Sequence, residues 1–226
     1  MARTTQVDVQ GQQMDVHVDE PAGPGPHPAV LVIFHAGGID DFTKKVAERC
    51  AAAGYVAVAP NLFHRRWGRE NLVDTELKAD IGATVELLKG MSNVDSGRVA
   101  IMGHCMGGRV SLLGACLYPD AFKGVVDYYG GNCFVTWGGD GPTPFDQLKN
   151  LRAPVVGFFG NDDGNPSPAD VDKIDAELGR LGIPHEFHRY DGAGHAFQNF
   201  LDPSRFREGP DQDAWAKTVA WLQANV

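Results

Sequence analysis

Hydrophobic residues follow two different patterns along this chain. Residues 6–18 alternate between apolar and polar side chains, which predicts an antiparallel hairpin near the N-terminal end. Further on, short unbroken apolar runs predict strands covered on both faces, at residues 29–34, 55–59, 99–102, 125–128 and 155–160. A last strand is expected at residues 186–190. Helices are expected between these runs, beginning near Asp41, Thr75, Gly107, Pro168 and Gln212.

This repeated alternation of strands and helices predicts an α/β fold. The central sheet should be mostly parallel, with helices on both faces and the hairpin at its N-terminal end. A length of 226 residues is suitable for one α/β domain, which we expect to span residues 1–226. Neither repeats nor a low-complexity segment interrupts this pattern.

Composition narrows the class of function. A hydrophobic content of 43% with 22% charged residues is ordinary for a soluble globular protein. The formal net charge of −9 argues against nucleic acid or an anionic membrane as a partner. No apolar run approaches the roughly 20 residues that span a bilayer, and the N-terminal residues lack a signal-peptide core, so we expect a cytoplasmic protein. No HExxH or comparable ligand set occurs, so we expect neither a metal nor another cofactor.

One segment carries the most specific chemistry. Residues 103–108 read Gly-His-Cys-Met-Gly-Gly and lie between a predicted strand and a predicted helix. This layout is typical of a nucleophile elbow, with Cys105 where a hydrolase usually carries serine. The flanking glycines remove the β-carbons that would block such a sharp turn. The turn would present the sulfur at a helix N-terminus, where partial positive charge favours the thiolate.

Other interpretations of this segment explain less. A free cysteine is most often a small buried hydrophobe, and we expect that of Cys50, Cys116 and Cys133. A core residue would not need the glycine-flanked turn around Cys105. A phosphate-binding loop would carry Lys-Ser or Lys-Thr, which are absent here.

A cysteine nucleophile needs a base and a carboxylate that orients the base. His195 follows the last predicted strand in a glycine-rich loop, and Asp163 follows the preceding one. The order nucleophile, acid, base is that of α/β-hydrolases. Asp162 is the main competitor of Asp163, and two further candidates for the acid are Asp127 and Asp191.

An oxyanion hole needs two converging N–H donors. We expect one from Met106, which follows the nucleophile, and the other from Ala36, in the small-residue loop after the first central strand. Arg69, in an arginine-rich segment with Trp67, and Tyr129, at the end of a strand, are candidates for substrate binding.

Together these motifs resemble the dienelactone hydrolase family of α/β-hydrolases. The resemblance runs from about residue 29 to residue 200. It rests on the cysteine elbow, Tyr-Tyr-Gly at 128–130, Gly160-x-x-Asp163 followed by prolines, and Gly-His-Ala-Phe at 194–197. It implies a triad of Cys105, His195 and Asp163 that acts on a cyclic enol ester, a lactone.

Two positions differ from the family pattern. The family has a glutamate after the first central strand that helps to ionise the thiol, and this chain has His35, which we expect to take part in activating the nucleophile. The family's dienelactone enzymes carry an arginine four residues after the catalytic histidine, suited to a substrate carboxylate. Asn199 occupies that position here, and we count it among the substrate-binding candidates.

The sequence therefore predicts a hydrolase that cleaves a small ester or lactone through a cysteine thiolate and an acyl-thioester intermediate. The alternative is a binding or thiol-sensor module on the same fold, in which Cys105 reacts with oxidants or electrophiles without turnover. An assembly protein fits least, because no hydrophobic surface stripe is evident. We expect a monomer or a homodimer.

Overall fold

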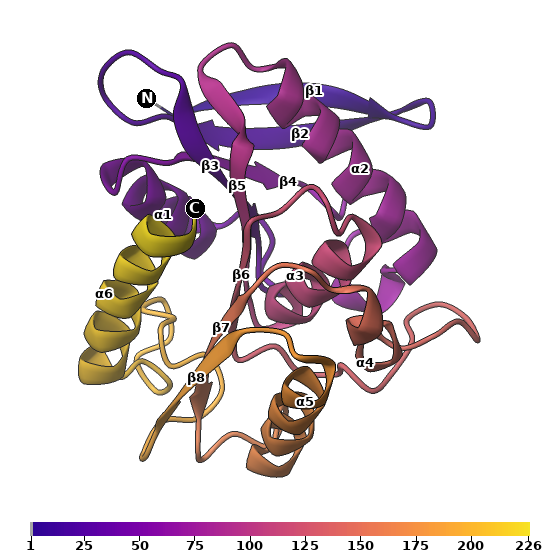
Figure 1. Ribbon diagram of the computed structural model, residues 1–226. Helices are drawn as coiled ribbons and strands as arrows, with labels where there is room; N and C mark the ends of the chain where they lie inside the picture. Colours follow the sequence, from indigo (N-terminus) through magenta and orange to yellow (C-terminus); the bar gives the residue numbers. More distant parts are fainter. Residues whose placement is uncertain (1) are drawn as a thin grey trace.

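The structure, a computed structural model, describes residues 2–226 and contains one eight-stranded sheet (Figure 1). The strands lie in the order β1-β2-β4-β3-β5-β6-β7-β8. Their bounds are β1 Arg3–Val9, β2 Gln12–Asp19, β3 His27–Ile33, β4 Val56–Pro60, β5 Val94–His104, β6 Gly124–Tyr128, β7 Val155–Gly160 and β8 His185–Tyr190.

The sheet is antiparallel at one edge and parallel elsewhere. β1 pairs with β2, and β2 with β4, in antiparallel register, which forms the N-terminal hairpin that the alternating pattern predicts. The remaining neighbours, from β4 through β3 to β8, all pair in parallel. The predicted α/β architecture is therefore confirmed.

Helices cover both faces of this sheet, as Figure 1 shows. The helix bounds are α1 Asp41–Ala52, α2 Asp74–Gly90, α3 Met106–Leu117, α4 Pro144–Gln147, α5 Pro168–Leu181 and α6 Glu208–Asn225, with short 3-10 turns at Arg69–Asn71 and Leu148–Asn150. Leu31 and Ile33 belong to the core under α2, α3 and α5, whereas Val30 and Val32 belong to the core under α1 and α6. This alternation explains why the strand is apolar throughout.

Several boundaries differ from the sequence-based prediction. β5 begins at Val94, five residues before the predicted start at Val99, because polar residues in its first half are exposed and break the apolar run. The four-residue helix α4 lies in a glycine-rich segment and carries too short a pattern to be predicted. None of the helices within residues 2–226 is long and apolar enough to cross a membrane.

The order of the strands determines where a site can form. From β3 the chain crosses to β4 on one side, and it returns to β5 on the other side of β3. At such a switch point the loops after the two central strands diverge and leave a crevice at the carboxyl ends of the strands. The loop that contains Ala36 follows β3, and Cys105 follows β5.

Candidate active site

Cys105 occupies a sharp turn between β5 and α3. Its φ of 59° and ψ of −121° lie in a region that side chains other than glycine rarely adopt. A β-carbon on Gly103 would lie 2.0 Å from the carbonyl oxygen of Gly107, and one on Gly107 would lie 2.3 Å from that of Ile33. Only glycine at both positions allows helix and strands to approach so closely, and this approach presents the sulfur at the end of the sheet.

The structure brings Cys105, His195 and Asp163 together. His195 Nε2 lies 2.9 Å from Cys105 Sγ, and His195 Nδ1 lies 2.8 Å from Asp163 Oδ2. Because a carboxylate only accepts, Nδ1 carries the proton of that bond and Nε2 faces the sulfur. The backbone N–H of Asn165 donates to the other oxygen of Asp163 at 2.8 Å, so both carboxylate oxygens are held.

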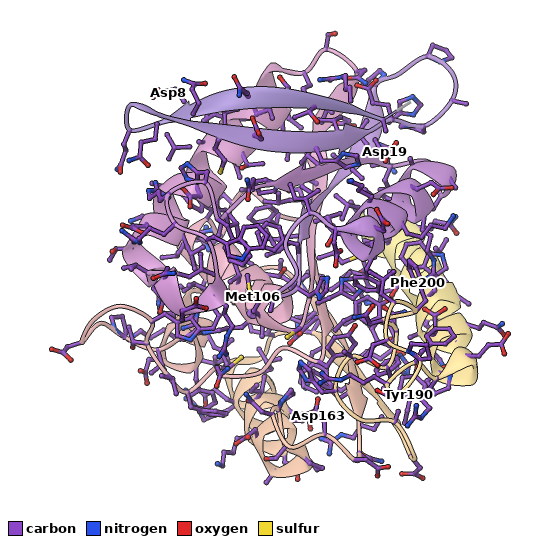
Figure 2. All side chains as sticks on the ribbon, turned by 180° about the vertical axis from the view of Figure 1, so that it is seen from behind. Asp8, Asp19, Met106, Asp163, Tyr190 and Phe200 are labelled. Carbon is purple, nitrogen blue, oxygen red and sulfur yellow. The ribbon has the colours of Figure 1, made fainter. Side chains whose placement is uncertain are left out.

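The other acids considered from the sequence do not contact His195. Asp127 is buried at the end of β6, where Oδ1 accepts from the backbone N–H of Gly130 at 2.8 Å. Its Oδ2 has no hydrogen-bond partner among the described residues. Asp191 accepts from the side chain of Asn161, and Asp162 is exposed. Asp163, which is labelled in Figure 2, is therefore the carboxylate that contacts the imidazole of His195.

The cysteine and the histidine shift each other's protonation. Burial alone would raise the pKa of Cys105, but the hydrogen bond and positive charge of His195 outweigh it and lower that pKa below its ordinary value. Burial alone would lower the pKa of His195, yet the bonds to Asp163 and Cys105 raise it to about 10. Both shifts favour the pair of thiolate and imidazolium over the neutral thiol and imidazole.

The predicted oxyanion-hole donors lie against the same sulfur. The backbone N–H groups of Met106 and Ala36 both contribute to lowering the pKa of Cys105. Figure 2 labels Met106 at the start of α3. Met106 lies after β5, and Ala36 lies after β3. Because both N–H groups are close to the sulfur, they would stabilise negative charge on the sulfur and on a nearby oxyanion.

These residues line an open cleft of about 420 Å³. Its walls also include Arg69, from the 3-10 turn after β4, together with Asn132 and Asn165. Arg69 is exposed, and its guanidinium has no hydrogen bond or ion pair within the described residues. Arg65 and Arg66, by contrast, are engaged by Asp80 and Glu76. Arg69 is thus the cationic side chain that the fold leaves available at the cleft.

Three other candidates lie elsewhere. Tyr129 is 1% exposed and packs edge-on against His195, with 5.3 Å between the ring centroids, so it helps to hold the imidazole in place. Asn199 accepts from the backbone N–H of Leu201 and does not line the cleft. His35 Nε2 bonds to Asp40 Oδ2 at 2.7 Å, and no hydrogen bond joins it to Cys105 in the described chain.

A buried polar chain behind the site was not predicted. His104 Nε2 contacts Gln198 Oε1 at 2.9 Å, and Gln198 Nε2 donates to Asp211 Oδ1 at 2.9 Å, while Arg49 holds that carboxylate. Burial lowers the pKa of His104 to about 3, so this ring is neutral. These hydrogen bonds connect His104, the residue before Cys105, to the segment that follows His195. Adjacency of His104 to Cys105 was the one available signal, since 94 positions separate it from Gln198.

The remaining cysteines have a different environment. Cys50, Cys116 and Cys133 are buried free thiols, and burial raises the pKa of each. Their burial confirms the prediction from the sequence, and a thiol with a raised pKa is a poor nucleophile. In the part of the chain that the structure describes, no group of three or more His, Cys, Asp or Glu side chains could hold a metal ion.

A sheet of this order, with the hydrogen-bonded residues Cys105, Asp163 and His195 after β5, β7 and β8, is the arrangement of the α/β-hydrolase class. Comparison with known proteins narrows this class. The profile of the dienelactone hydrolase family matches residues 14–226. The chain therefore belongs to the dienelactone hydrolase family, a family of hydrolases.

Individual relatives agree with this assignment. A Methylorubrum extorquens protein named "Putative carboxymethylenebutenolidase" is 32% identical over 217 residues, covering 90% of this chain and 74% of the relative. A Bradyrhizobium protein named "Probable 2-oxo-3-(5-oxofuran-2-ylidene)propanoate lactonase" is 29% identical, covering 94% of this chain and 90% of the relative. A Klebsiella pneumoniae crystal structure, named a "Putative Dienelactone Hydrolase", superposes with a TM-score of 0.91 at 26% identity, over 99% of this chain and 98% of that one.

Proposed function

We propose that this protein hydrolyses a carboxylic ester or lactone that bears a carboxylate, with Cys105 as the nucleophile. One observation carries the proposal. The imidazole of His195 spans 2.9 Å to the sulfur and 2.8 Å to Asp163, which is the geometry of an activated thiolate. The family to which the chain belongs is one of hydrolases.

In the first half of the reaction the thiolate attacks the carbonyl carbon and forms a C–S bond. The carbonyl oxygen takes up the negative charge and accepts from the N–H groups of Ala36 and Met106. When the intermediate collapses, the C–O bond to the alcohol or enol breaks, and His195 Nε2 gives its proton to that leaving oxygen. In a lactone the leaving oxygen stays attached to the acyl group, now a thioester.

The second half releases the acid. His195, now neutral, accepts a proton from a water molecule, whose oxygen attacks the thioester carbonyl. The same two N–H groups hold the second oxyanion. Collapse breaks the C–S bond and restores the thiolate beside an imidazolium, while Asp163 keeps the ring in the required tautomer throughout.

The carboxylate in this proposal is suggested by Arg69. This exposed guanidinium has no partner among residues 2–226, and at the wall of the cleft it can pair with a planar carboxylate through two N–H donors. The names of two relatives, a carboxymethylenebutenolidase and a propanoate lactonase, describe lactones that carry such a group. A neutral substrate would leave this side chain unused.

The test compares purified wild type with Cys105→Ala on a panel of neutral aryl esters and carboxylate-bearing lactones. The variant should lose at least about 10³-fold in kcat/KM on every substrate that wild type hydrolyses. Arg69→Met should raise KM for carboxylate-bearing substrates by about tenfold and leave neutral esters unchanged. Arg66→Met is the matched control, because Arg66 is exposed nearby but paired with Glu76.

Two results would contradict the proposal. Retention of activity by Cys105→Ala would exclude the cysteine as nucleophile. Stoichiometric labelling of Cys105 by the esters, without release of acid, would favour the thiol sensor instead.

A further inference from the structure

His35 stands where the family pattern has a glutamate that acts on the thiol, yet it bonds to a different partner. Its Nε2 lies 2.7 Å from Asp40 Oδ2. Because the carboxylate accepts only, Nε2 is the donor in this bond. Burial would raise the pKa of Asp40, but its bonds to His35 and to Thr43 lower it, so the carboxylate is charged over the range where enzymes work.

The hydrogen-bonded side chains of His35 and Asp40 lie directly next to Gly37. A β-carbon on Gly37 would lie 2.6 Å from Asp40 Oδ2 and 2.7 Å from His35 Cε1. A side chain at position 37 would displace this pair, which therefore lies directly against the loop that carries Ala36. The ring of His35 also packs edge-on against Phe42 at 5.1 Å between centroids, which fixes its plane.

The same two residues belong to a closed ring of hydrogen bonds. Asp40 Oδ1 accepts from the backbone N–H of Thr43 at 3.0 Å, and Thr43 Oγ1 donates to the carbonyl of Gly38 at 2.8 Å. The N–H of Gly38 in turn donates to the carbonyl of His35 at 3.0 Å. The side-chain bond of His35 to Asp40 completes the circuit.

This ring determines the direction of one oxyanion-hole donor. The carbonyl of His35 and the N–H of Ala36 belong to a single planar trans peptide group, in which they point in opposite directions. When Gly38 holds that carbonyl from one side, the N–H of Ala36 must point to the other side, where Cys105 lies.

We infer that His35 is a positioning residue, which holds the Ala36 N–H in the oxyanion hole through its bond to Asp40 and does not act on the sulfur. This inference rests on the proposed function, because an oxyanion forms only during acyl transfer. Breaking the bond should let the peptide between residues 35 and 36 rotate. The hole would then lose part of the stabilisation from one donor, while the thiolate would keep its ion pair with His195.

Two reactions of Cys105 separate these effects. Alkylation by iodoacetamide needs the thiolate but forms no oxyanion, whereas acylation by an activated ester needs both. His35→Leu should lower ester kcat by about tenfold to hundredfold, less than the loss of a whole donor, and should change the alkylation rate by less than about threefold. His35→Gln, whose amide can still donate to Asp40, should recover most of the ester activity.

Control variants keep the result interpretable. His17 pairs with Asp19 at 3.2 Å on β2, and neither residue lines the cleft, so His17→Leu removes the same kind of pair and should leave both reactions unchanged. Asp40→Asn is a second test that does not depend on the folding of the His35 variants. Its Oδ1 can still cap α1 at Thr43, but it no longer offers the carboxylate acceptor to His35. Thermal melting verifies that each variant is folded.

The inference is overturned if acylation and alkylation fall together in His35→Leu, since His35 would then act on the thiolate. It is equally overturned if ester turnover in His35→Leu and Asp40→Asn matches that of His17→Leu. Wild-type protein that is alkylated normally but hydrolyses no ester would instead overturn the proposed function, and the two failures are therefore distinguishable.

Discussion

Two histidine–carboxylate pairs of nearly equal geometry lie at the carboxyl edge of this sheet. His195 and Asp163 are 2.8 Å apart, and His35 and Asp40 are 2.7 Å apart. The free nitrogen of His195 faces a sulfur, whereas the bond made by His35 encloses a glycine of the oxyanion loop. We propose that the same chemical unit orients a reacting group in one place and a backbone donor in the other. What it contacts beyond the carboxylate decides its role.

Asp163→Asn should produce the largest difference between the pairs. An amide in place of the carboxylate presents a donor to His195 Nδ1 and favours the wrong tautomer, so kcat on an activated ester should fall by about 10³-fold or more. Asp40→Asn should lose about a hundredfold at most. Steady-state kinetics of both variants on one ester measure the ratio. Equal losses would contradict the division of roles.

His195→Gln tests the ion pair through pH. His195 lowers the pKa of Cys105, so its contribution to thiolate content is present below the ordinary thiol value of about 8.5 and disappears above it. Alkylation of the variant by iodoacetamide should be slower than wild type by about tenfold to thirtyfold at neutral pH and should approach wild type in alkaline buffer. His35→Gln is the matched variant, and its alkylation profile should overlay that of wild type. A profile that shifts equally in both variants would assign His35 to the thiolate.

Asp127 is a buried carboxyl without a histidine partner. Of the substitutions considered, Asp127→Asn should have the smallest effect on activity. Burial raises the pKa of Asp127 to about 7, although the hydrogen bond from the backbone N–H of Gly130 lowers it in part. The folded-state pKa is above the unfolded one, so the stability that comes from the protonated acid is complete in acid and lost as pH rises through about 7.

The wild-type free energy of unfolding should therefore fall by about 2 to 3 kcal/mol as pH rises from about 5 to 8, and Asp127→Asn should remove this decrease. The activity of this variant should stay within about threefold of wild type, because Asp127 contacts neither His195 nor Cys105. Denaturant titrations at several pH values measure the slope. A variant with the wild-type slope would mean that Asp127 stays ionised in the folded protein.

The sequence was sufficient to predict the parts of the site that depend on short-range pattern. The glycines around Cys105 predict a sharp turn. The loops that contain Asp163 and His195 each follow a predicted strand, and the carboxyl ends of parallel strands lie at the same edge of the sheet. The oxyanion candidates Ala36 and Met106 follow from the same rule. Hydrophobic pattern also predicted the hairpin and the alternating helices, which the structure confirms.

The parts that were missed depend on directions that a pattern does not contain. His35 lies next to Ala36 in sequence, and from sequence alone its ring could turn toward Cys105 or toward Asp40. The partner of His104 is Gln198, which is distant in sequence and comes close only in the folded protein. Tyr129 directly follows β6 at the edge of the sheet where Cys105 lies, but its ring is buried against His195 and does not line the cleft.

The central claim is that Cys105 carries the acyl group, and intact-mass spectrometry tests it most directly. Wild type and Asp163→Asn would be quenched in acid during turnover of an activated ester, and each would be digested to locate any adduct. The account predicts an added acyl group on Cys105, more abundant in Asp163→Asn, where the histidine that assists water is misoriented. Two results would contradict the claim that Cys105 carries the acyl group. One is substrate consumption without an adduct in both proteins, and the other is an acyl adduct at another residue that also forms in Cys105→Ala.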